Sequence, residues 1–243
     1  MLLDTSLDFN SEVAGKDADT YSLTLQAYHQ ALWSKELPSG KGFDLVCMGK
    51  PGRLYLAHCL EDGTLELSSD AITNRFRRSP VATSLAAGND LPRNLGYTIG
   101  SALVFPRARR EGKQTINQRR GTHPRIRDRF DLTLECIRQH YAGASSPLGD
   151  VLDRYADFFE LFTDFRGYVD FFLLQDLVSA DYEVQFLHEF RNFTTAAVPT
   201  TKAAYLSYLE RSNSFIMARN RRIAVWASGK GTTLEEAREP VGP

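Results

Sequence analysis

The spacing of apolar residues changes from a strand-like to a helical pattern near the middle of the chain, and this change limits the folds that the chain can adopt. Before Pro106, short apolar runs rich in β-branched or aromatic residues alternate with turn residues, at 43–48, 54–59 and 64–68. This pattern predicts a small antiparallel meander. After Pro124, apolar residues recur at helical spacing instead. We therefore predict an α+β fold, in which a small N-terminal antiparallel or mixed sheet packs on a C-terminal helical layer.

The remaining elements follow from local patterns. Residues 20–34 have an apolar helical face, and Asp19 or Thr20 can cap their start. Asp70 is predicted to cap a short helix, and residues 79–96 to form a loop. The later predictions, in chain order, are a strand at 97–105, helices at 124–141, 150–162 and about 167–178, a strand at 183–187, and a final helix from Thr200 or Thr201 to about Trp226.

Two of these predicted helices, between residues 150 and 178, are unusually rich in aromatic residues. A ligand cage is one interpretation, but an aromatic stripe at helical spacing is typical of a core. We therefore predict that these side chains are buried: Tyr155, Phe158, Phe159, Phe162, Phe165, Tyr168, Phe171 and Phe172.

Composition places the chain among globular proteins. It has 243 residues, of which 42% are hydrophobic and 24% are charged. These values exclude a fibrous, collagen-like or wholly disordered chain. No repeat or low-complexity linker divides the sequence. We predict one domain at 1–227 and a flexible C-terminal tail at 228–243, where Gly, Pro and Glu are frequent.

Targeting and cysteine signals point to a reducing compartment. The N-terminus lacks a basic region followed by an apolar run, and no apolar run approaches the ~20 residues of a membrane span. We therefore predict a cytoplasmic protein without a membrane partner. Cys47, Cys59 and Cys136 stand at unrelated spacings, so they predict small buried side chains rather than a metal or redox motif.

Known catalytic motifs are not found in the sequence. The segment 229–232 is no phosphate-binding loop, because Ala224 stands at the first glycine position and no Ser or Thr directly follows Lys230. The five histidines stand apart, without metal-ligand spacing. The sequence therefore assigns no catalytic residue, cofactor or metal. It also leaves open whether the protein is an enzyme, and what its oligomeric state is.

Charge is distributed unevenly along the chain, although the net charge is only −1. Residues 1–74 carry a net charge of −6, residues 75–129 carry +10, and residues 130–243 carry −5. Twelve of the thirteen central cations are arginines, whose planar forks suit phosphate and carboxylate groups. The basic segment can bind a phosphate-bearing ligand, or it can pair with the two acidic flanks of the same molecule.

The densest part of this basic segment leads into the helix predicted at 124–141. A glycine beside arginines just before a helix start can build an anion site, because free N–H groups and the positive dipole end face the anion. We therefore predict a candidate anion-binding site that comprises Asn117, Arg120, Gly121, His123, Arg125 and Arg129.

Arg129 is placed by helical geometry inside the apolar arc of that helix. A cation on a buried face needs a partner, either a structural carboxylate or a ligand anion. The same geometry places Asp128, Asp131 and Glu135 on the opposite, polar face. They are predicted to be solvated there, with a metal site as the alternative.

Three functional hypotheses remain open. The first is a protein that binds a nucleotide or nucleic acid through residues 107–129. The second is an enzyme that hydrolyses such a ligand with carboxylates beside the arginines, such as Asp70, Asp128 or Asp131. The third is a non-catalytic interaction protein whose basic and acidic regions pair internally.

Two long blocks carry a family resemblance: DRFDLTLECIRQHY at 128–141 and DFFELFTDFRGYVDFFLLQDLV at 157–178. With shorter segments such as LSSD at 67–70, they resemble an uncharacterised bacterial family of the domain-of-unknown-function type. The resemblance covers about residues 1–223. Because that family has no assigned activity, the resemblance implies an uncharacterised protein and adds no catalytic residue.

Overall fold

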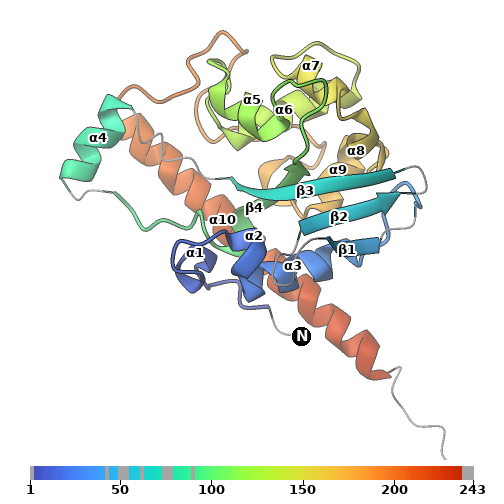
Figure 1. Ribbon diagram of the computed structural model, residues 1–243. Helices are drawn as coiled ribbons and strands as arrows, with labels where there is room; N and C mark the ends of the chain where they lie inside the picture. The colour runs from blue at the N-terminus through green and yellow to red at the C-terminus, as the bar shows by residue number, and fades with distance from the viewer. Residues whose placement is uncertain are drawn as a thin grey trace, which may run out of the picture.

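The computed structural model describes residues 3–41, 44–48, 55–60, 63–72, 79–88 and 91–236. Within these ranges the fold is α+β, as predicted. Helices gather on both sides of one sheet, and a long C-terminal helix crosses the whole molecule diagonally (Figure 1). None of the described helices combines the length and the hydropathy that crossing a bilayer requires.

The sheet contains four antiparallel strands in the order β1-β2-β3-β4. The first three form the predicted meander: β1 (Asp44–Met48), β2 (Tyr55–Leu60) and β3 (Gly63–Ala71). The fourth, β4 (Ala102–Pro106), is shorter than the predicted strand because a 3₁₀ turn, η1 (Ile99–Ser101), precedes it. Asp70 lies in β3 and pairs with Leu103, so the prediction that it caps a helix is wrong.

The N-terminal helices are α1 (Phe9–Glu12), α2 (Ala18–Tyr21) and α3 (Leu23–Trp33). The predicted helix at 20–34 is therefore largely confirmed, but its cap is Ser22, whose Oγ accepts from the N–H of Leu25 at 3.0 Å. The predicted loop at 79–96 contains a helix, α4 (Pro80–Ala87). Ser79 caps α4 and Pro80 occupies its first turn, where proline costs no hydrogen bond.

The C-terminal half is helical, but its helices are shorter than predicted. They are α5 (Ile116–Thr122), α6 (Phe130–Tyr141), α7 (Gly149–Asp153), α8 (Ala156–Glu160), α9 (Phe165–Phe171) and the 3₁₀ turn η2 (Gln175–Leu177). Positive φ angles at Thr163 and Leu173 mark where the chain turns out of α8 and α9. The strand predicted at 183–187 is reduced to one bridge between Val178 and Val184.

The final helix, α10 (Lys202–Glu236), begins where it was predicted. The Oγ1 of Thr201 accepts from the N–H of Ala204 at 3.2 Å and caps this start. The helix continues ten residues beyond the predicted end at Trp226. The division into one domain and a tail from residue 228 stays a prediction.

The aromatic residues of α8 and α9 form the centre of the core, as predicted. Trp33 of α3 packs with ring centroids 5.0 Å from Phe171 and 5.8 Å from Phe172. Phe162 lies 5.0 Å from Phe172 and 6.4 Å from Trp33, so it belongs to the same cluster of rings. All eight predicted aromatic residues are buried. Cys136 is also buried, whereas the side chains of Cys47 and Cys59 lie outside the described part of the chain.

One fully buried cation, Arg219 in the middle of α10, ties four parts of the fold together. Its Nη1 donates to the carbonyl oxygens of Gly100 and Ala102, each at 2.8 Å. Its Nε and Nη2 both donate to the carbonyl oxygen of Phe172, and Nη2 also donates to the hydroxyl of Tyr28. These acceptors belong to η1, β4, α3 and the end of α9. Arg219 therefore joins these elements through hydrogen bonds to their backbone carbonyls and to one hydroxyl.

Replacing Arg219 with lysine tests this role. The ammonium has three donors where the guanidinium has five, so at least two of the five hydrogen bonds are lost. Each buried carbonyl left unsatisfied costs about 1–3 kcal/mol. The five bonds end on four acceptors, so three donors leave at least one of them unsatisfied. We expect Arg219→Lys to lower the free energy of unfolding in urea by at least about 1–3 kcal/mol. The exposed Arg221→Lys on the same helix is the matched control and should change it by less than about 0.5 kcal/mol. Equal effects of the two substitutions would contradict the role.

Candidate functional site

Half of the predicted anion site lies inside a helix rather than before one. Asn117, Arg120 and Gly121 belong to α5, and His123 is its C-terminal cap. The first turn is closed by a capping box, in which Thr115 Oγ1 accepts from the N–H of Gln118 and Gln118 Oε1 accepts from the N–H of Thr115. The arginines therefore stand at the negative end of the helix dipole. The predicted free N–H groups at this position are not there.

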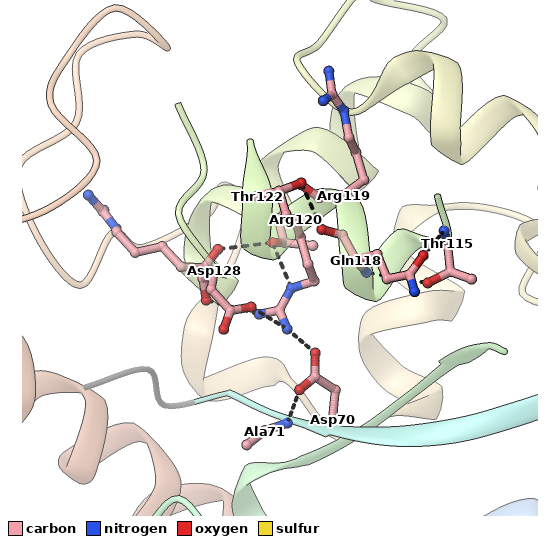
Figure 2. A network of polar contacts seen from close by, with 10 residues as sticks. Asp70, Ala71, Thr115, Gln118, Arg119, Arg120, Thr122 and Asp128 are labelled. Atoms are coloured by element: carbon pink, nitrogen blue, oxygen red, sulfur yellow. Dashed lines mark hydrogen bonds and ion pairs between the residues drawn. The ribbon is translucent and has the colours of Figure 1, made fainter. Parts of the chain in front are cut away.

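Arg120 is fully buried and lies between two carboxylates (Figure 2). Its Nη1 contacts Asp70 Oδ2 and lies 3.0 Å from Asp128 Oδ1. Its Nε donates to Thr133 Oγ1 at 3.3 Å, and its Nη2 donates to the carbonyl oxygen of Asp128 at 3.1 Å. Every nitrogen of the guanidinium thus already has a protein acceptor.

Alternation along β3 explains how Asp70 reaches this position. Successive side chains of a strand point to opposite faces, so Asp70 meets Arg120 while Ser69 faces the other side. There Ser69 Oγ lies 2.8 Å from Nε2 of the buried His29, and its N–H donates to Asp19 Oδ2. Burial, with a smaller effect of Arg219, lowers the pKa of His29 to about 3, so this imidazole is neutral in the fold.

The turn after α5 brings Asp128 back to the same arginine. Arg127 and Asp128 both adopt positive φ, at 49° and 67°. The N–H of Asp128 donates to the carbonyl oxygen of Arg120 at 2.9 Å. Burial raises the pKa of Asp128, and Asp70 adds to this rise, while Arg120 opposes it. Backbone and side chain together lock the turn around Arg120.

Arg129 has the structural carboxylate partner that was the first of the two predicted alternatives. Its Nε and Nη2 donate to the two carboxylate oxygens of Asp131 at 3.1 and 2.5 Å, and both side chains are fully buried. Its Nη1 donates to the carbonyl oxygen of Ala197 at 3.0 Å, and its Nη2 to that of His188 at 3.2 Å. Asp131 also accepts from the N–H of Leu187. The pair therefore holds the segment 187–197 against α6.

Two predictions about this helix are wrong. Helix α6 begins at Phe130, so Arg129 is the residue before its first turn rather than an interior position. Asp131 and Glu135 are buried instead of solvated, because each is paired: Asp131 with Arg129, and Glu135 with Arg138. Across the described ranges, no three side chains of His, Cys, Asp or Glu come together as a metal site would require.

The acidic flanks supply partners for the basic segment. Asp70 comes from the first flank. Asp157 comes from the second, and its carboxylate accepts from both Nη1 and Nη2 of Arg110, at 2.7 and 2.6 Å. Of the candidate site, His123 and Arg125 remain at the surface, next to Arg119, and Gly121 faces open space. The structure therefore brings Arg120 and Arg129 into internal pairs and separates them from the rest of the predicted site.

A different feature, missed by the sequence analysis, lies along α10. Two adjoining cavities of about 530 and 460 Å³ share Asp176 and Ala218 as lining residues. Together they form one groove, the α10 groove, between this helix on one side and η2 with residues 185–187 on the other. With about 100° per residue and Arg219 at zero, the lining residues of α10 fall in one arc from about −20° to about −160°: 226, 215, 222, 211, 218, 225, 214 and 221.

The cations of the α10 groove differ in pairing. Arg222 donates to both oxygens of Asp176 at 2.9 Å, through Nε and Nη2. Arg211 and Arg221 are exposed, and no carboxylate of the described residues lies within salt-bridge distance of either. Only the helical spacing of these three arginines could have indicated the feature, and that spacing is typical of any solvated helix face.

Comparisons with known proteins give a family but no function. A family model described as a family of unknown function, DUF6994, matches residues 3–223. No curated protein and no solved structure matches the chain.

Substitution of Arg129 tests the buried pair. Arg129→Ala would leave the Asp131 carboxylate buried without its cation, so we expect it to lower the free energy of unfolding by roughly 3–5 kcal/mol. Arg125→Ala, at an exposed position four residues earlier, is the matched control and should cost less than about 1 kcal/mol. Thermal unfolding of both variants measures the difference. Small and equal losses would show that the pair does not stabilise the fold.

Proposed function

Because the chain belongs to DUF6994, a family of unknown function, we propose its function from its own geometry: it is an interaction protein that holds an anionic partner in the α10 groove. The observation that carries this proposal is the pair of exposed, unpaired guanidinium groups, Arg211 and Arg221, on the wall of a groove of ligand-binding size. Positive groups that have no carboxylate partner among the described residues favour a binding partner that supplies the negative ones.

The state of the central basic segment supports this choice among the three hypotheses. Arg110, Arg120 and Arg129 each hold a carboxylate of the protein, which favours internal charge pairing. The hydrolytic hypothesis required two convergent carboxylates beside the arginines. Asp70 and Asp128 do converge, but both contact the one guanidinium between them, so their geometry supports a structural role.

Charge reversal in the groove tests the proposal. We expect Arg211→Glu with Arg221→Glu to abolish salt-sensitive retention of the protein on a polyanion such as immobilised heparin, because both unpaired cations of the groove are lost. Arg109→Glu with Arg125→Glu reverses the same number of exposed cations elsewhere and serves as the matched control. If the control pair loses retention and the groove pair keeps it, the anion site is the central segment and the proposal is wrong.

A second candidate is a phosphate-bearing ligand, nucleotide or nucleic acid, at the surface part of the predicted site. The observation that favours it is the crowding of Arg119, His123 and Arg125. Burial lowers the pKa of His123, and the charges of Arg119 and Arg125 lower it further. An anion bound among these three groups would relieve that repulsion.

The titration of His123 tests this second candidate. Bound phosphate favours the charged imidazolium, so the pKa of His123 should rise when inorganic phosphate is added. In Arg125→Ala the pKa should already be higher without phosphate, since one repelling charge is gone, and it should respond less. Proton chemical shifts followed against pH give both values. An unchanged pKa of His123 across a phosphate titration would exclude binding at this place.

A further inference from the structure

We infer that the partner held in the α10 groove is an amphipathic peptide helix with an aliphatic face and acidic residues about three turns apart. This inference rests on the proposed function and names the class of partner. It follows from the length of the groove, the side chains that line it, the spacing of its charges and the contacts that its aromatic rings already make within the protein.

The groove has the dimensions of a short helix. Its lining residues on α10 run from Arg211 to Trp226, and at about 1.5 Å per residue this stretch is roughly 22 Å long. A peptide helix of about four turns has the same length. The two cavities adjoin at Asp176 and Ala218, where Arg222 of α10 is paired with Asp176 of η2, so a partner that spans the stretch passes over this ion pair.

The lining suits an aliphatic surface. Its floor consists of buried apolar side chains, among them Leu177, Leu187 and Phe215. Val225 at the rim is 73% exposed, and Met217 on the neighbouring helical stripe is 44% exposed. These two residues lie four positions after and four positions before Arg221. Val225 lies within the arc of the groove, so an apolar face set against the groove would cover it. Met217 lies beyond Arg221 around the helix, so the guanidinium stands at the border between the groove and Met217.

The charges define the spacing of the partner's acidic residues. Arg222 is neutralised by Asp176. The two groove cations without a carboxylate partner among the described residues are therefore Arg211, at one end of the lining stretch, and Arg221, next to Arg222. They are ten residues apart on one helix, or about 15 Å. Carboxylates ten or eleven residues apart on a partner helix share one face at the same separation. Such a partner would meet both cations at once.

The aromatic rings argue against a single-stranded nucleic acid as the partner. Such ligands stack their bases on exposed aromatic faces. In this groove, the Nζ of Lys35 lies 5.6 Å from the centroid of Trp226, and Phe186 packs 4.2 Å from Phe190. Phe215 is buried. The rings thus already have partners within the protein, and the large apolar side chain that the lining exposes, Val225, is aliphatic.

Selection from a random peptide library tests the inference. Peptides of about 16 residues are selected on the immobilised full chain, with counter-selection on the Arg211→Glu, Arg221→Glu variant. We expect the enriched sequences to show apolar residues at helical spacing and acidic residues ten or eleven positions apart. Their affinity should fall by on the order of tenfold in Val225→Asp. The matched control is Leu23→Asp on α3, since Leu23 is also 73% exposed but lies outside the groove, and it should leave the affinity unchanged.

The contrary outcomes separate this inference from the function on which it rests. Enriched peptides without helical spacing, or without paired acidic residues, overturn the inference. A single-stranded oligonucleotide that binds more tightly than any peptide, and loses affinity in Arg211→Glu, Arg221→Glu, overturns it too but supports an anionic partner in the groove. If neither the peptides nor the oligonucleotide distinguishes that variant from the unaltered chain, both the inference and the proposed function fail.

Discussion

The rest of the structure depends on one buried guanidinium, that of Arg219, whose acceptors among the described residues are all neutral. Arg219 places its five hydrogen bonds on three carbonyl oxygens and one hydroxyl, and burial lowers its pKa. A buried charge is costly unless every donor is satisfied, so these acceptors must be held in place. The end of α9, the turn before β4 and helix α3 meet at this one group, and the rotation of α10 about its axis is fixed by it. The α10 groove is a consequence of that rotation.

Local sequence patterns predicted those parts of the fold that depend only on residues within one segment. The meander, the start of α10 and the burial of the aromatic stripe needed only alternation, a capping residue and apolar spacing. The prediction failed where the chain turns within a predicted helix, as at Leu173 and at Arg127-Asp128. Positive φ at residues other than glycine leaves no signal in composition. Such a backbone conformation is stabilised by tertiary contacts, such as the hydrogen bond from Arg120 Nη2 to the carbonyl oxygen of Asp128.

The charged residues show why the candidate site was only partly predictable. The need of Arg129 for a carboxylate followed from its place among apolar residues, but the choice of Asp131 did not. Helical phase put Asp131 on the opposite face, and this phase was wrong because α6 begins six residues later than predicted. Likewise, Asp70 is fifty residues from Arg120, and only the pairing of β3 with β4 brings it there. An excess of basic residues in one segment of the sequence therefore does not predict how many unpaired positive charges that segment exposes on the surface.

Four arginines of α10 illustrate the missing information. Their positions in the sequence span only twelve residues, yet Arg219 is buried, Arg222 is paired, and Arg211 and Arg221 are exposed. Helical geometry relates their directions to one another: relative to Arg219, Arg222 and Arg211 lie near −60° and −80°, and Arg221 lies near −160°. Geometry alone does not say which direction is inward. Once the buried contacts of Arg219 define that direction, Arg222 is placed beside Asp176, and Arg221 is turned toward the outer edge of the groove. The buried contacts of Arg219 thus leave two separated positive charges, Arg211 and Arg221, on the surface of α10. A count of the arginines in the sequence could not have distinguished this arrangement from a helix face on which all of them are solvated.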